Sequence, residues 1–369
     1  MTIARTDAVS RALRNPRALA AWSLAQWEDL VRQARSANLL SRLAVLLDDE
    51  GLEHRVPEAP RAHLDAARVV ARAQEEAVRR EVAYIRKALT RTGVDVVLLK
   101  GAAYLFAELP AARGRLFSDV DILVPGSALA EVEAALMLHG WATTHHDPYD
   151  QRYYREWMHE LPPMMHVTRQ TVLDVHHAIV PTTARLKPQS GKLLAASRPV
   201  PGEPGVRTLA PADMVLHSAA HLFLNEELSS GLRDLADLDS LLRHFGQDPG
   251  FWNELVARAR ELDLARPLYY AVRYATRILE TLLPVQMVEA SDGGGPPTLL
   301  RPLMDGLFLR ALRPDHVCAA DRFTALARSA LYVRAHWLRM PPLLLARHLT
   351  VKAFRRQGET AGNKEETNH

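Results

Sequence analysis

The chain has 369 residues and a formal net charge of +3, and 48% of its residues are hydrophobic while 24% are charged. This composition is ordinary for a soluble globular protein with a sizeable core, and the mild positive charge permits a polyanionic partner without requiring one. The single cysteine, Cys318, excludes an internal disulfide and suits a reducing compartment.

The N-terminal part of the sequence predicts helices. Its first residues, MTIARTDAVSRALRNP, lack the apolar core of a signal peptide. Apolar residues recur at helical spacing over 18–92, and 59–92 reads as one long helix with Pro60 in its first turn and Gly93 just past its end. No window of the chain approaches ~18 uncharged apolar residues, so we expect no transmembrane helix and a cytoplasmic location.

Strand and helix patterns alternate in the middle of the chain. VDVVLLK at 94–100 is typical of a buried strand, and 101–109 predicts a short helix. LFSDVDILV at 116–124 predicts a second strand, and 126–140 a capped helix. Aromatic and β-branched residues indicate further strands, around 141–146, 152–158, 163–168 and 171–176.

The C-terminal part predicts helices again. The segment 198–211, rich in proline and glycine, reads as a linker, and nearly everything from 212 to 356 reads as helix, interrupted by a loop at 289–298. The polar end of the chain predicts disorder. We therefore expect four regions: an N-terminal helical region (1–93), an α/β core (94–205), a C-terminal helical domain (206–356) and a disordered tail (357–369).

Two carboxylates, Asp119 and Asp121, interrupt the apolar strand predicted at 116–124. Side chains alternate along a strand, so both lie on one face, roughly 7 Å apart at the backbone, where like charges cost stability. Carboxylates combined with substrate phosphates are the ligands that Mg²⁺ prefers. Asp174 supplies a third carboxylate from another predicted strand, with His176 on the same face.

Glycine at a strand–helix junction fits the same chemistry. Gly101 follows the first predicted strand, which lets a phosphate approach the backbone and the free N–H groups of the next helix. Two metal ions about 3.5–4 Å apart can clamp the attacking and leaving oxygens of a phosphoryl transfer. The alternative is that the paired aspartates form ion pairs with Arg113 and Arg115 at a sheet edge.

Three short motifs follow one another along this part of the chain. They are Lys100-Gly101-Ala102, Arg115-x-x-Ser118-Asp119-Val120-Asp121-Ile122-Leu123-Val124 and Leu173-Asp174-Val175-His176. They resemble the nucleotidyltransferase superfamily with the DNA polymerase β-type fold, and more narrowly a bacterial group of uncharacterised nucleotidyltransferases. A helical segment with His217, His221 and the run Arg233-Asp234…Asp237 is similar to the one that follows the catalytic unit in that group. The resemblance covers roughly residues 95–245.

The resemblance implies an α+β fold in which a small mixed sheet is flanked by N- and C-terminal helices. It implies a Mg²⁺-dependent enzyme, with two ions and Mn²⁺ as the other suitable metal. Such an enzyme moves a nucleoside monophosphate from an NTP, ATP among them, to an acceptor and releases pyrophosphate. Asp119 and Asp121 would hold the nucleotide-bound metal, and Asp174 the second metal while it orients or deprotonates the attacking hydroxyl.

The resemblance also implies nucleotide contacts. Gly101 would border the triphosphate, and Ser118 belongs to the nucleotide-binding motif. The superfamily's usual Gly-Gly or Gly-Ser element ends here in Ala102, a departure that weakens the expected grip on the triphosphate. Lys100 and Arg115 are the residues that can supply compensating charge.

The acceptor stays open between a small molecule, a sugar, and a peptide or protein, because no basic patch interleaved with aromatics singles out a nucleic acid. Two alternatives belong to other classes of function. One is a degenerate nucleotidyltransferase that binds a nucleotide or partner without turnover, which Ala102 favours. The other is a helical interaction protein whose α/β insert is purely structural.

The histidines allow several interpretations. His176 is a candidate residue of the nucleotide site, where it would orient a phosphate or transfer a proton. The alternative is a structural histidine that forms a hydrogen bond with a neighbouring backbone carbonyl. His159 and His166, which flank the apolar segment LPPMM, are interpreted as structural. His217 and His221 share one helical face, a spacing that can bind zinc.

For the last two histidines we favour a packing role, through bonds to Asp234 or Asp237. Arg233, beside them, is a candidate to reach a phosphate. The stretch 336–356, apolar with several arginines, suits an anionic membrane surface or a nucleic acid, but an amphipathic helix that closes the bundle explains it better.

Overall fold

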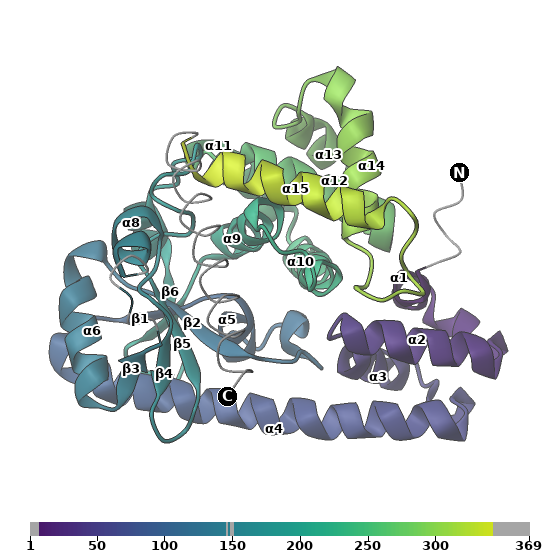
Figure 1. The fold of residues 1–369 in the computed structure, drawn as a ribbon, viewed down its shortest axis with the longest axis horizontal. Coiled ribbons are helices and arrows are strands. Elements are labelled where there is room, and N and C mark those ends of the chain that lie inside the picture. Colours follow the sequence, from purple (N-terminus) through teal and green to yellow (C-terminus); the bar gives the residue numbers. More distant parts are fainter. Residues whose placement is uncertain (1–6, 145–146, 148–150, 342–369) are drawn as a thin grey trace, which may run out of the picture.

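The computed structural model describes residues 7–144, 147 and 151–341 of the chain. A mixed sheet stands at one side of the molecule, and helices from both ends of the chain surround the rest of it (Figure 1). Helix α4 (Glu58–Leu89) runs the length of the molecule, with the N-terminal helices packed at one end and the sheet at the other (Figure 1). None of the helices in these described ranges is long and apolar enough to cross a membrane.

The N-terminal helices are amphipathic. Their apolar stripes face one another, and in α4 the stripe consists of Leu64, Ala71, Val78, Val82, Ile85 and Leu89. The shorter helices are α1 (Ala8–Arg14), α2 (Leu24–Ser36) and α3 (Leu40–Asp49). A capping box between Ser23 and Gln26 begins α2, so the start of this helix is encoded locally.

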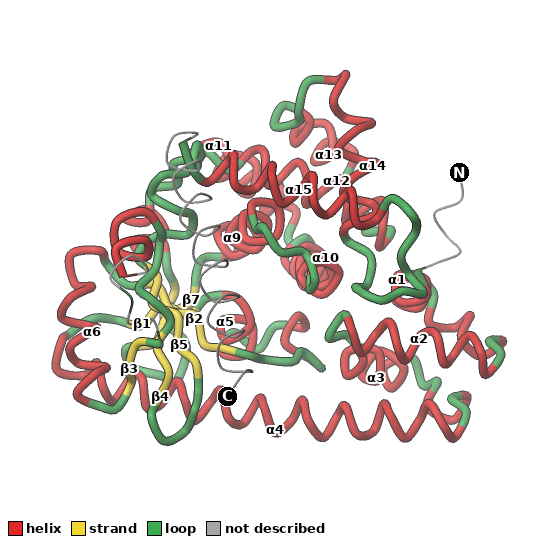
Figure 2. Tube along the Cα trace, viewed as in Figure 1, coloured by secondary structure: helices red, strands yellow, loops and turns green. Residues whose placement is uncertain are grey.

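The sheet has seven strands within the described chain, in the order β3-β4-β5-β2-β1-β7-β6. β2 pairs with β5 in parallel, β1 pairs with β7 in parallel, and the other neighbours are antiparallel. Figure 2 shows the strands, in yellow, gathered beside the helical bulk of the molecule. The strands are β1 (Val96–Leu98), β2 (Asp119–Leu123), β3 (Trp141–Thr143), β4 (Met164–His166), β5 (Val172–His176), β6 (Arg198–Pro199) and β7 (Val206–Thr208). The predicted α+β class with flanking helices is confirmed.

Short helices join these strands. α5 (Lys100–Phe106) connects β1 to β2, α6 (Leu129–Leu138) packs against α4, and α8 (Ser190–Ala196) precedes β6. α5 is buried along nearly its whole length, because it lies between the sheet and the C-terminal helices.

The C-terminal helices pack around α9 (Pro211–Leu224), which is buried on almost every side and contacts α10, α11, α12 and α15. The other helices of this region are α10 (Gly231–Phe245), α11 (Pro249–Glu261), α12 (Ala265–Leu279), α13 (Val285–Asp292), α14 (Arg301–Ala311) and α15 (Thr324–Arg339). Because α9 also contacts α5, the helical bundle lies directly beside the sheet.

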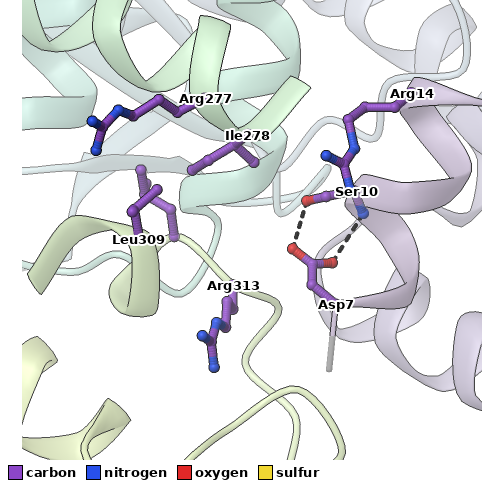
Figure 3. A pocket seen from close by; sticks show the side chains of 8 residues that line it. Asp7, Ser10, Arg14, Arg277, Ile278, Leu309 and Arg313 are labelled. Atoms are coloured by element: carbon purple, nitrogen blue, oxygen red, sulfur yellow. Dashed lines mark hydrogen bonds between the residues drawn. The ribbon is translucent and has the colours of Figure 1, made fainter. Parts of the chain in front are cut away.

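Helix α1 packs against these C-terminal helices, where it contacts α12. Asp7 caps α1 by accepting hydrogen bonds from the backbone N–H and the hydroxyl of Ser10, at 2.9 and 2.5 Å. Figure 3 shows the small pocket between this cap and the side chains of Ile278 and Leu309, on α12 and α14. Burial raises the pKa of Asp7.

Some segments differ from the sequence predictions. Residues 152–158 form a short π-type helical turn, η7 (Tyr153–Trp157), and not a strand, because aromatic side chains pack in either backbone form. The segment 198–211 is no linker: Gly202 and Gly205, both with φ of 76°, turn the chain so that β6 and β7 form a hairpin that extends the sheet. The sheet thus continues past the expected core boundary at 205.

Helix α13 reaches into the loop that the sequence predicts at 289–298. The predicted positions 145–146, the stretch 342–356 and the tail 357–369 lie outside the described residues.

Candidate functional site

The parallel pairing of β2 and β5 brings three carboxylates together. Asp121 lies directly opposite Asp174 in the register, and Asp119 lies opposite Val172. One carboxylate oxygen from each aspartate lies within 4.8 Å of the others. The residues that the sequence singled out on two separate segments therefore converge on one face of the sheet.

Asp174 has the least compensated charge of the three. Its Oδ1 is buried and has no hydrogen-bond partner among the described residues. Burial, together with the nearby carboxylates of Asp121 and Glu160, raises the pKa of Asp174 to about 7. An oxygen-only donor set with an unpartnered buried carboxylate oxygen fits a hard divalent cation such as Mg²⁺ or Mn²⁺.

Asp121 is held by two cationic or potentially cationic groups. Its Oδ1 accepts hydrogen bonds from Nζ of Lys100 at 2.7 Å and Nε2 of His176 at 2.9 Å. Burial alone would raise the pKa of Asp121, but Lys100 and His176 hold it well below the ordinary value. Lys100 therefore offsets part of the repulsion within the carboxylate cluster.

Lys100 reaches this position through an unusual backbone conformation. Its φ is 45°, in the left-handed region that side chains other than glycine rarely adopt. The turn directs the chain from β1 into α5 while the ammonium group lies beside β2. Such strain costs on the order of 1–3 kcal/mol and concentrates at functional sites.

A pocket of about 260 Å³ opens over the carboxylates. The α/β unit supplies Lys100 from α5, and Asp119, Asp174 and His176 from the sheet, to its wall. The C-terminal helices supply the opposite wall, with Ala220, His221, Leu224 and Asn225 from the α9 region and Arg339 from α15. The pocket is thus formed jointly by the α/β unit and the helical bundle.

The remaining motif residues lie away from this pocket. Ser118 is exposed, and its hydroxyl donates a hydrogen bond to Oδ1 of Asp119 at 2.8 Å. Ala102 is 2% exposed inside α5. A Cβ added to Gly101 would lie 2.3 Å from Nη1 of Arg115, so the glycine leaves room for a guanidinium group. The contacts of these residues with a phosphate stay predictions.

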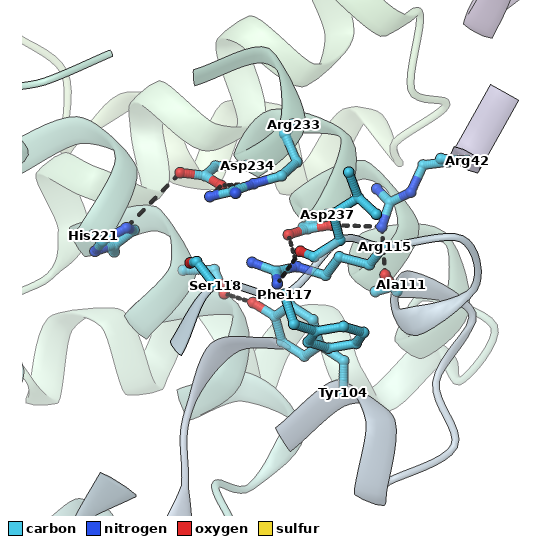
Figure 4. A network of polar contacts seen from close by, with 12 residues as sticks. Arg42, Tyr104, Ala111, Arg115, Phe117, Ser118, His221, Arg233, Asp234 and Asp237 are labelled. Atoms are coloured by element: carbon cyan, nitrogen blue, oxygen red, sulfur yellow. Dashed lines mark hydrogen bonds and ion pairs between the residues drawn. The ribbon is translucent and has the colours of Figure 1, made fainter. Parts of the chain in front are cut away.

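Arg115 belongs to a buried ion-pair network. Its Nε donates to Oδ2 of Asp237 at 2.9 Å, and Nη2 of Arg42 donates to Oδ1 of the same carboxylate at 2.6 Å (Figure 4). Arg113, the other candidate partner of the paired aspartates, instead binds Asp49. The alternative in which both arginines neutralise Asp119 and Asp121 is therefore wrong.

The paired histidines of α9 take different positions. His217 is buried, and desolvation lowers its pKa to about 3. His221 lines the pocket, with Nε2 3.8 Å from Oδ2 of Asp234 (Figure 4). In the part of the chain that the structure describes, neither belongs to a group of metal-ligand side chains. Arg233 binds the neighbouring Asp234.

Sequence reasoning did not assign His159, Glu160 or Arg339 to the site. His159 and Glu160 lie against His176, and Arg339 enters from the far end of the chain. The only sequence signal for His159 and Glu160 was that they form a histidine–glutamate pair before an apolar segment, which is too weak to predict a site. His166, by contrast, packs against Trp141 at a ring distance of 5.0 Å.

Comparison with known proteins matches the chain to a protein family. A family model described as an uncharacterised nucleotidyltransferase matches residues 23–280, which is more than half of the chain. The matched segment includes the carboxylate-bearing strands, α9 and α10, and also most of the N-terminal helices. No curated protein and no solved structure gives a significant match.

Proposed function

Because the chain belongs to the family of uncharacterised nucleotidyltransferases, we propose that it transfers a nucleoside monophosphate from an NTP to an acceptor and releases pyrophosphate. The observation that carries the proposal is the convergence of Asp119, Asp121 and Asp174 across β2 and β5. The third interpretation, a structural α/β insert, needs these side chains to diverge, and they do not.

The three aspartates are the proposed metal ligands. Asp119 and Asp121 would hold the ion that accompanies the nucleotide phosphates, and Asp174 would help to hold a second ion. When bound, two Mg²⁺ or Mn²⁺ ions neutralise phosphate charge and stabilise the attacking and leaving oxygens. Lys100, beside Asp121, adds a positive charge at the edge of the same cluster.

The transfer itself forms one bond and breaks one bond. The acceptor oxygen attacks the α-phosphorus, the bond from that phosphorus to the bridging oxygen breaks, and pyrophosphate leaves. The acceptor hydroxyl loses its proton to the carboxylate of Asp174, which is the proposed general base. Most of the acceleration comes from positioning and charge neutralisation, as in phosphoryl transfer generally.

The test is stabilisation by nucleotide. Wild type should gain thermal stability with Mg²⁺ and an NTP, whereas the double variant Asp119→Asn, Asp121→Asn should not. As the control, Asp29→Asn, Asp65→Asn removes two carboxylates from exposed positions on α2 and α4 and should respond like wild type. Equal stabilisation of wild type and the site variant would refute the metal site.

A second candidate function is nucleotide binding without turnover. It is favoured by Ala102 and by the ion pair that already engages Asp121 with Lys100. Release of pyrophosphate from labelled NTPs distinguishes the two, because a binder gives thermal stabilisation but no pyrophosphate. Mass spectrometry of small-molecule, sugar and protein acceptors after incubation with each NTP then identifies the acceptor by the mass of an added NMP.

A further inference from the structure

A second group of potential ligands lies in the same pocket, next to the carboxylates but with different chemistry. The chain just before β4 runs antiparallel to the end of β5. The N–H of Leu161 donates to the carbonyl of Val175 at 2.9 Å, and the N–H of His177 donates to the carbonyl of His159 at 2.8 Å. This pairing places Glu160 opposite His176. Backbone hydrogen bonds, and not flexible side chains alone, therefore position the group.

The side chains converge on the carboxylate of Glu160. Its Oε2 lies 3.2 Å from Nδ1 of His176 and 3.9 Å from Nε2 of His159. The two imidazole rings lie side by side, with centroids 5.2 Å apart and planes 31° from parallel. One donor atom from each of the three residues lies within 4.8 Å of the others.

His176 carries the observation that points to a cation. It is 3% exposed, and its Nε2 donates to Asp121, so the proton of a neutral ring resides on Nε2. Nδ1 is then a lone pair that faces the carboxylate of Glu160, and it makes no hydrogen bond to any residue that the structure describes. Two electron-rich atoms at this distance need a positive charge between them.

The arrangement matches that of metal-bound histidines. A histidine that ligates a metal through one nitrogen usually donates its other N–H to a carboxylate, which fixes the ring and its tautomer. Asp121 is that carboxylate for His176. Two imidazoles and one carboxylate also form a common three-residue ligand set of zinc sites that keep a position open for a substrate or water.

We propose that His159, Glu160 and His176 form a transition-metal site that is separate from the all-oxygen site of the three aspartates. Zn²⁺ is the metal ion whose preferred ligands match these side chains best. Nitrogen donors select Zn²⁺ or Co²⁺ over Mg²⁺, whereas the aspartates select Mg²⁺ or Mn²⁺. The open position of this site faces the pocket, since all three residues line it. The inference does not depend on transfer activity, because metal binding is measured without nucleotide.

The experiment titrates untagged, metal-free protein with Zn²⁺ by calorimetry and with Co²⁺ by visible absorption. Wild type should bind one Zn²⁺ tightly and give the intense visible bands of four- or five-coordinate Co²⁺. His159→Ala and Glu160→Gln should each weaken Zn²⁺ binding at least tenfold and remove the Co²⁺ bands. The double variant Asp119→Asn, Asp174→Asn should keep both signals and lose nucleotide-dependent stabilisation by Mg²⁺.

His221→Ala is the matched control, because His221 lines the same pocket from α9 but lies outside the ligand group. It should bind Zn²⁺ as wild type does. A cooperative thermal transition verifies that each variant folds, and Glu160→Gln, which keeps the side-chain volume, decides the result if His159→Ala does not fold. Absence of a tight site in wild type, or unchanged binding in both ligand variants, would overturn the proposal and leave a protonated His176 between Asp121 and Glu160.

Discussion

Asp174 holds its carboxylate where burial and the carboxylates of Asp121 and Glu160 all oppose ionisation, which raises its pKa from 3.8 to about 7. An acid with a higher pKa in the folded than in the unfolded state takes up a proton on folding. The metal-free protein therefore loses stability as the pH rises from 3.8 to about 7, and this loss is complete above that range. A divalent cation bound by the proposed ligands would offset this loss.

Asp174→Asn should remove this loss. In metal-free buffer at pH 8, the free energy of unfolding should rise by ~2–4 kcal/mol over wild type, and the gain should disappear below about pH 4. Urea unfolding across pH measures it. Asp29→Asn, at an exposed position, should change little. If the variant is no more stable than wild type at pH 8, ionised Asp174 does not destabilise the metal-free protein and the prediction is wrong.

At the scale of elements, the turn from β1 through α5 to β2 depends on the close approach of the Arg115 side chain to the backbone of Gly101. The guanidinium of Arg115 lies where a side chain of residue 101 would be, and Phe117 closes the same space. The glycine of the motif is thereby explained by packing against the arginine of the next motif. Lys100, one residue earlier, is positioned by the same turn.

Gly101→Ala should destabilise the protein by ~1–3 kcal/mol, because the added Cβ requires Arg115 to move from a buried ion pair. The matched control is Gly191→Ala, also at the second residue of a seven-residue helix, α8, where an added Cβ meets nothing within 4 Å. This control should be neutral or stabilising by ~0.4–1 kcal/mol. Both values come from urea unfolding, and equal effects would argue against the close approach.

At the scale of the whole molecule, Asp237 joins three parts of the chain. Arg42 reaches it from α3, Arg115 from the segment before β2, and Asp237 itself belongs to α10. The carboxylate is 3% exposed, and the two arginines lower its pKa against the effect of burial. The pocket is lined by residues of both the α/β unit and the C-terminal helices. We therefore expect the ion pairs of Asp237 to stabilise the packing of these two regions against each other.

Asp237→Ala should cost ~3–5 kcal/mol of unfolding free energy, because it leaves two arginines buried and unpaired. Asp49→Ala is the control: it removes the exposed ion pair with Arg113, which also links α3 to the segment before β2, and should cost ~1 kcal/mol or less. Thermal and urea unfolding measure both. Similar small losses in the two variants would show that the buried network does not join the regions.

Much of the fold and part of the site followed from local patterns. Side-chain periodicity and short motifs are properties of neighbouring residues, so they can be recognised in the sequence alone. They predict the long helix α4, the strands β1, β2 and β5, and the motifs around Asp119, Asp121 and Asp174. The family match confirms the resemblance that those motifs indicate and extends it over 23–280.

Only the tertiary structure decided which of these residues meet. The parallel register that sets Asp121 opposite Asp174, the approach of His159 and Glu160 to His176, and the pairing of Arg115 with a residue 122 positions away are choices among many possible partners. Such choices depend on how buried surfaces and charges pack together in space, and a contact between distant segments leaves no periodic trace in either one.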